Sequence, residues 1–226
     1  MSTATERLDT RGVVEGQKAL IALALLAPVG PVAVAVLRYV LPYETTDSTK
    51  EIVRETYADP GAMSLALWLT LVAALTIVPG AIAVGRFVRS GAPRLTAVAL
   101  ALTVPGYLML PMLAGLDHPV WMAAESGASQ ATAVALLDAA HPSYALATGI
   151  FVVGHVLGTV LLGVAMLRSG RVPTWAAVAT IVSQPLHFFA AVIVPNHTLD
   201  GVAWGLNAIG FAAAAVAIIQ SRGRQT

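Results

Sequence analysis

Six long stretches of the chain are almost wholly apolar and alternate with short polar segments. Each stretch reaches about 20 residues or more, the length that an α-helix needs to cross a bilayer. The first stretch is too long for the core of a signal peptide, so we take it as a retained span. The pattern predicts an all-α bundle of six transmembrane helices at about residues 18–41, 62–88, 95–116, 142–167, 173–194 and 199–220.

Two of the polar segments are long enough to hold short helices of their own. In loop 42–61, Ser48 is followed three residues later by Glu51, which is the pattern of a capping box at a helix start. In loop 117–141, Ser129 precedes an apolar run of about 12 residues, too short to span a bilayer. Both loops are predicted to carry a helix on the extracytoplasmic side.

The composition agrees with a membrane location. Hydrophobic residues make up 57% of the chain and charged residues 11%, against about 25% charged residues in soluble proteins. The net charge of +1 gives no basic footprint for nucleic acid, and the lack of cysteine excludes disulfides and thiolate metal sites. We expect a lipid bilayer around the chain, no nucleic-acid partner, and a homodimer as one possible assembly. The excess of arginine over lysine points to a bacterial cell membrane.

The charges of the loops predict the orientation. Most Lys and Arg residues fall in the two tails and in the loops near Arg86 and Arg168, whereas most acids fall in the opposite loops. Because basic loops stay in the cytoplasm, both termini are predicted to be cytoplasmic. This divides the chain into a cytoplasmic tail at 1–17, a membrane domain at 18–220 and a cytoplasmic tail at 221–226. Arg38, near the outer end of the first span, is expected to snorkel to the interface.

The fourth span carries a stripe of polar residues on one helical face: His141, Tyr144, Thr148, His155 and Thr159. Polar groups in a membrane helix normally face other helices or water, because lipid offers them no partner. The stripe therefore predicts one wall of a buried polar site.

The fifth and sixth spans supply further polar groups, again each on one face. At 1.5 Å per residue from the outer end of each span, His187 and Asn207 are predicted to be about 12 Å deep, Thr148 about 10 Å and His155 about 20 Å. We predict an outward-facing intramembrane pocket between spans four, five and six that binds, senses or transports a small amphiphilic molecule. Its ligand-binding residues are predicted to be Thr148, His155, Gln184, His187, Trp204 and Asn207.

Three other interpretations remain open. In the first, the polar residues only bridge neighbouring helices, and Gly154-x-x-x-Gly158 and Gly201-x-x-x-Gly205 let spans four and six pack closely. In the second, the chain is a haem b protein. His141 and His155 have the spacing of a two-haem helix, although the facing helix offers only His187 and, beyond its end, His197.

The third interpretation is a membrane-embedded enzyme that acts on a lipid or isoprenoid. General acid–base catalysis needs a titratable pair, and the best candidates as catalytic residues are Asp200 and His187. The sequence contains no hydrolase or metalloprotease motif that would support this choice.

Overall fold

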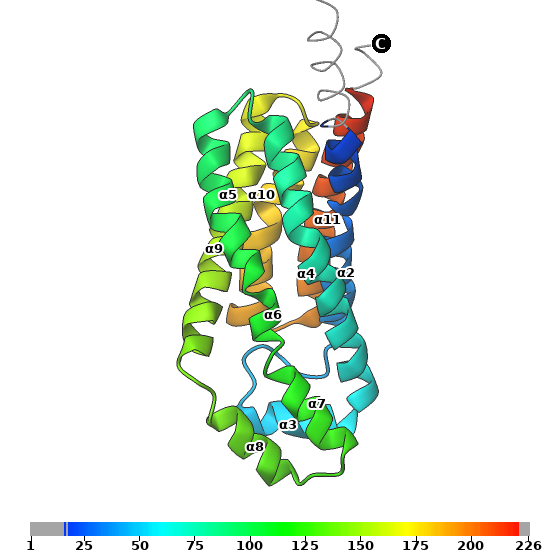
Figure 1. Ribbon diagram of the computed structural model, residues 1–226, viewed down its shortest axis with the longest axis vertical. Helices are drawn as coiled ribbons and strands as arrows, with labels where there is room; N and C mark the ends of the chain where they lie inside the picture. Colours follow the sequence, from blue (N-terminus) through cyan, green and yellow to red (C-terminus); the bar gives the residue numbers. More distant parts are fainter. Residues whose placement is uncertain (1–15, 17, 222–226) are drawn as a thin grey trace, which may run out of the picture.

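The computed structural model describes residue 16 and residues 18–221, and every regular element among them is helical (Figure 1). Nearly all of the two predicted tails, 1–17 and 221–226, lies outside the described residues. The labelled helices are α2 (Val29–Val40), α3 (Thr49–Ala58), α4 (Pro60–Val88), α5 (Pro93–Leu108), α6 (Leu110–Leu113), α7 (Asp117–Glu125), α8 (Gln130–Asp138), α9 (Ser143–Ser169), α10 (Thr174–Phe188) and α11 (His197–Gln220). A π-helical turn, η1 (Phe189–Ile193), continues α10.

Six helical segments are long and apolar enough to cross a membrane, which confirms the predicted all-α membrane fold. They are Lys18–Val40, Pro60–Val88, Pro93–Glu125, Ser143–Ser169, Thr174–Ile193 and His197–Gln220. Large apolar side chains such as Leu75, Leu146 and Ile209 lie exposed along the bundle. An apolar surface of this extent would be unstable in water, so the surroundings are a lipid bilayer.

Three short helices form a cap across one end of the bundle (Figure 1). The cap has its own small core, in which Val53 of α3, Val120 of α7 and Ala133 of α8 are buried together. The predicted capping box is present: Ser48 accepts from the backbone N–H of Glu51, whose side chain accepts from the N–H of Ser48. These hydrogen bonds to its side chain lower the pKa of Glu51, so α3 is stabilised above that pKa and loses this support as the pH falls through it.

The closest helix pair in the bundle is α5 with α9, and it depends on glycine. A Cβ on Gly154 would lie 2.7 Å from the Cα of Gly106, and one on Gly158 would lie 2.5 Å from the backbone N of Thr103. Gly201 instead lies under the ring of Tyr39 on α2. The prediction that these glycines join spans four and six is therefore wrong, since the fourth span packs on the third.

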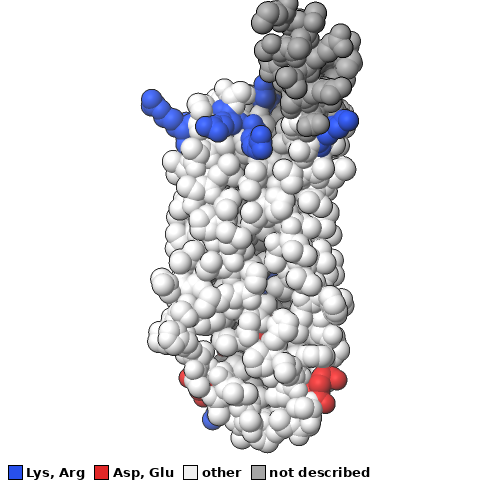
Figure 2. Space-filling view, viewed as in Figure 1, with Lys and Arg blue, Asp and Glu red and all other residues white. Residues whose placement is uncertain are grey.

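The charged residues of the bundle separate toward its two ends (Figure 2). Arg86, Arg89, Arg94, Arg168 and Arg171 lie at the end opposite the cap, where the first span begins and α11 ends. Acidic residues gather at the capped end, where Glu44, Asp47 and Glu51 precede or begin α3. Between the two ends the visible surface is almost free of charge, as a lipid-facing belt requires.

Candidate functional site

Three charged or titratable side chains from three helices meet in the capped half of the bundle. Arg38, in the last turn of α2, forms a salt bridge through Nε with Asp200 Oδ2, and His187 Nδ1 on α10 lies 2.5 Å from Asp200 Oδ1. Asp200 is fully buried and Arg38 is nearly so. The guanidinium of Arg38 thus joins the bundle to the loop that follows α2, because its Nε contacts Asp200 while its Nη2 donates to Thr45 at 2.8 Å.

Local structure places each member of this trio. Asn196 caps α11 by accepting from the N–H of Leu199, which sets Asp200 in the first turn, where the helix dipole favours a negative charge. On α10, His187 lies between Pro185 and the π-helical turn that follows Phe188. Proline and π-turns both disturb regular helical hydrogen bonding, and π-turns are frequent at functional sites.

The indole of Trp204 also contacts Nδ1 of His187. Trp204 Nε1 lies 3.1 Å from the same Nδ1 atom that contacts Asp200. The indole N–H donates to Nδ1, so this nitrogen is shared by the N–H of Trp204 and the carboxylate of Asp200. The side chain of His187 is 13% exposed.

His155 packs against this group, although its predicted depth separated it from His187. Its ring centroid lies 5.3 Å from that of His187 and 5.8 Å from that of Tyr107. It is stacked between Phe151, at 4.1 Å, and Trp204, at 6.1 Å. The depth estimate failed because it gave all spans one outer plane, whereas α9 extends farther toward the cap than α10 and η1 (Figure 1).

Several buried polar atoms beside these rings lack a hydrogen-bond partner among the described residues. They are His155 Nε2, Gln184 Oε1 and both amide atoms of Asn207. Nδ1 of His155 donates to the carbonyl of Phe151 at 2.6 Å, so Nε2 is an acceptor in the neutral ring. The amide of Asn207 lies beside the hydroxyl of Tyr107, which is hydrogen-bonded to Thr159 at 3.0 Å. We call these side chains the polar core: Tyr107, His155, Gln184, His187, Trp204 and Asn207.

The structure thus brings together four of the six predicted ligand-binding residues, His155, His187, Trp204 and Asn207. Gln184 is buried on α10 beside Ser183, and Thr148 lies apart. Thr148 lies two turns, about 10 Å, outward of His155 along α9, and donates its hydroxyl to the carbonyl of Tyr144. Sequence reasoning missed Tyr107 and Arg38. Arg38 could have been found from the sequence, because it is an arginine near the outer end of an apolar span. Asp200 is an acid near the outer end of another span and was therefore a candidate partner.

The histidines do not form the two pairs that a two-haem bundle needs. His141 is exposed and contacts Ser143, and Nε2 of His197 lies 3.0 Å from Glu44. His155 instead packs against the rings of Phe151 and Trp204. Among the described residues, no group of three or more His, Asp and Glu side chains is arranged to hold a metal ion.

A second polar network joins the bundle to the cap. The hydroxyl of Tyr43 donates to Asp117 at 2.8 Å, and Nε2 of His197 lies 3.1 Å from the carbonyl oxygen of Tyr43. Burial raises the pKa of the Tyr43 hydroxyl, and the Asp117 carboxylate raises it further. These contacts hold the start of α11 and the start of α7 on the loop after α2.

Two cavities on the surface of the bundle are lined by other residues. One, of about 320 Å³, lies between α4, α6 and α7 and includes Trp68, His118 and Trp121. The other lies at the arginine-rich end. Trp68 is exposed, as a residue of an interfacial belt should be, whereas Trp121 packs with Leu41 and Met63.

Comparison with known proteins gives one match. Residues 19–221, which are most of the chain, match the family DUF4386. This family is described as a domain of unknown function. Neither the curated proteins nor the solved structures contain a match.

Proposed function

The chain belongs to the DUF4386 family, and we propose that it is a membrane protein whose polar core binds a small uncharged molecule. The site lies between α9, α10 and α11, the fourth, fifth and sixth spans, with Tyr107 of α5 as a further wall. The ion pair of Arg38 and Asp200 closes it on the side of the cap.

The observation that carries this proposal is the set of unpaired polar atoms. A buried donor or acceptor without a partner costs about 1–3 kcal/mol, and His155 and Gln184 each contribute one such atom, beside the Asn207 amide, which has the Tyr107 hydroxyl next to it. Helix packing alone would favour apolar residues at these positions. A bound molecule with its own donor and acceptor would satisfy these atoms, and water would do so in its absence.

The charges of the site favour a neutral ligand. Arg38 and Asp200 neutralise each other, so the core offers no free charge to a charged molecule. His155 Nε2 and Gln184 Oε1 accept hydrogen bonds, while Asn207 both donates and accepts. The aromatic rings of Tyr107, Phe151 and Trp204 supply an apolar wall, so the ligand is amphiphilic.

We expect Asn207→Leu to abolish retention of the ligand while the protein still folds, because leucine keeps a similar volume and removes both polar atoms. The measurement is native mass spectrometry of the full chain released from native membranes, which reports any small molecule carried by the protein. The matched control is Gly205→Ala, two residues away, where a Cβ meets nothing within 4 Å. A wild-type protein that carries no small molecule, or an Asn207→Leu protein that carries the same one, would contradict the proposal.

A second candidate function is acid–base catalysis on a lipid or isoprenoid, and the contact of Asp200 with His187 favours it. The carboxylate lies 2.5 Å from Nδ1, and in the tautomer with the hydrogen on Nδ1 the Nε2 atom of His187 would be free to accept a proton. If the dyad acts this way, full-length protein in vesicles of its own native lipids yields a new lipid species by mass spectrometry. His187→Gln would then abolish that product, and a product that persists in this variant would exclude His187 as the base.

The proposal includes an orientation in the cell membrane with both termini in the cytoplasm, a membrane domain over 18–220 and tails on either side. The arginines at the end away from the cap support it through the positive-inside rule. The chain has no cysteine, so a single introduced cysteine would be its only site for labelling by a maleimide. In intact cells we expect a membrane-impermeant maleimide to label Ser126→Cys, beside α7, and to spare Ser90→Cys, after α4. The reverse pattern would invert the topology.

A further inference from the structure

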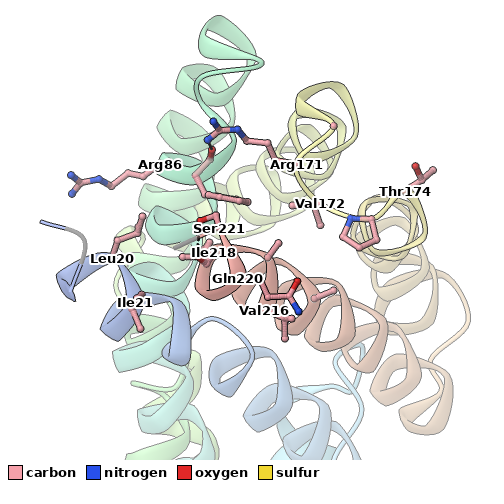
Figure 3. Close-up of a pocket in the computed structure, with 15 residues that line it drawn as sticks. Leu20, Ile21, Arg86, Arg171, Val172, Thr174, Val216, Ile218, Gln220 and Ser221 are labelled. Carbon is pink, nitrogen blue, oxygen red and sulfur yellow. Dashed lines mark hydrogen bonds between the residues drawn. The ribbon is translucent and has the colours of Figure 1, made fainter. Parts of the chain in front are cut away.

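A large cavity opens at the end of the bundle opposite the cap. It has a volume of about 940 Å³ and lies between the start of the first span, the end of α4, the start of α10 and the end of α11 (Figure 3). The polar core lies in the other half of the bundle, so the two sites share no residue. Binding sites for small molecules have volumes of about 300–1,000 Å³, which includes this cavity.

One side of the cavity is basic. Arg86 and Arg171 line it from α4 and from the loop before α10, and no described lining residue is acidic. Nη1 of Arg171 donates to the carbonyl of Phe87 at 2.9 Å, and its guanidinium lies 5.3 Å from the centre of the Phe87 ring. Arg171 is thus fixed at the rim by α4, while four of its five N–H groups remain for other acceptors. Arg86 is exposed and has no partner among the described residues.

The start of α10 adds further hydrogen-bond donors to the same wall. Thr174 is the first residue of α10 and lines the cavity, and Pro173 before it provides no side-chain cap. The first turn of α10 also contains no acidic residue. Uncapped N–H groups and the helix dipole favour an anion at such an end.

Below these polar groups the cavity is lined by apolar residues. They include Leu20 and Ile21 of the first span and Val216 of α11 (Figure 3). A basic rim above an apolar wall matches a molecule with an anionic head and a hydrocarbon tail. A free inorganic anion would leave the apolar wall without a partner.

We infer that this cavity binds an anionic phospholipid of the adjacent leaflet. The phosphate lies beside Arg171 and the start of α10, with Arg86 at the outer edge of the cavity, and one acyl chain lies along Leu20, Ile21 and Val216 (Figure 3). Arginine suits this role because its planar fork donates two parallel hydrogen bonds to phosphate. The inference goes beyond the proposed function, because it concerns a separate site at the other end of the bundle.

The test compares phosphatidylglycerol with phosphatidylcholine. Full-length protein is reconstituted in mixed bilayers of the two lipids, released into detergent, and its retained lipids are counted by native mass spectrometry. We expect phosphatidylglycerol to be enriched on the wild type and to bind at least about tenfold more weakly to the Arg86→Gln/Arg171→Gln variant, since each basic residue near a membrane surface contributes about 1 kcal/mol. The matched control is Arg94→Gln, at the same end but outside the cavity, which should bind as the wild type does.

Several outcomes would overturn the inference. These are equal retention of both lipids by the wild type, unchanged binding by the double variant, or a loss in Arg94→Gln as large as in the double variant. Displacement of phosphatidylglycerol by inorganic phosphate alone would assign the site to a free anion instead. Arg86→Gln by itself keeps the test valid if the double variant does not fold, because the Arg86 side chain is exposed and has no described partner. We expect this single variant to lose part of the enrichment, and full retention would count against the site.

Discussion

Replacement of Arg38 by methionine is expected to destabilise the folded protein by about 3–5 kcal/mol, which is the usual cost of removing one partner of a buried ion pair. Methionine keeps the length and the apolar stem of arginine and removes the guanidinium. Asp200, which is fully buried, then remains as an uncompensated carboxylate between α2 and α11. Unfolding of the purified protein in detergent, followed by circular dichroism, measures the change.

A double variant separates the effect of the unpaired charge from the effect of lost packing. In the Arg38→Met/Asp200→Leu protein no charge is left unpaired, so most of the lost stability should return, because buried ion pairs are often replaced by apolar pairs at little cost. Arg54→Met is the matched control, since its ion pair with Glu55 is exposed to solvent and contributes little to stability. A single variant as stable as the wild type would show that Asp200 is not ionised in the folded protein.

The sequence predicted the elements of this fold well because each signal is local. A run of about 20 apolar residues needs a membrane whatever surrounds it, and Ser48 reaches Glu51 within a single helical turn. The polar stripe of the fourth span also indicated which face is buried, since lipid offers no partner to a polar group. Burial of His155 and Thr159 agrees with that argument.

The partners across the bundle were not predictable from the same signals. A glycine pair shows that one face of a helix allows a close approach, but it does not say which helix approaches. Gly154 and Gly158 therefore suggested the sixth span, whereas they contact α5. The partner depends on the arrangement of six helices around one another, which local spacing does not contain.

The composition of the site was predicted better than its geometry. Counting residues from the outer end of each span placed His155 about 8 Å too deep to meet His187, because it assumed that all spans end at one level. The cap breaks that assumption, since α9 extends toward α8 while α10 and η1 end earlier (Figure 1). The pairing of Arg38 was missed for a related reason: its salt bridge with Asp200 joins two helices that are distant in the sequence.

The two halves of the bundle differ in the side chains that fill them. Toward the arginine-rich end the core is formed by small and apolar side chains, including Ala81, Val84, Leu162 and Phe211. Toward the cap, helices of the same hydropathy enclose Asp200, His155 and Asn207. Since apolar side chains fill the core of one half, helix packing alone does not require the polar residues of the other half, which is the physical basis of the proposed site.

Replacing His155 by phenylalanine is expected to raise the stability of the ligand-free protein and to abolish ligand retention. Phenylalanine fills the place between Phe151 and Trp204 with a ring of similar shape. It removes the unpaired Nε2, whose burial costs about 1–3 kcal/mol, at the expense of one hydrogen bond to the Phe151 carbonyl. That carbonyl already belongs to the helical hydrogen-bond ladder of α9, so the net change should be a gain.

Thermal unfolding and native mass spectrometry on the same preparation test both parts of this prediction. The stability gain should raise the melting temperature by about 2–4 °C per kcal/mol. His141→Phe, at an exposed position just before the same helix, is the matched control and should leave ligand retention unchanged. If His155→Phe lowers stability and the variant still carries the wild-type molecule, then His155 serves packing alone. A gain in stability together with loss of the ligand would mean that the chain keeps a less stable core in order to bind.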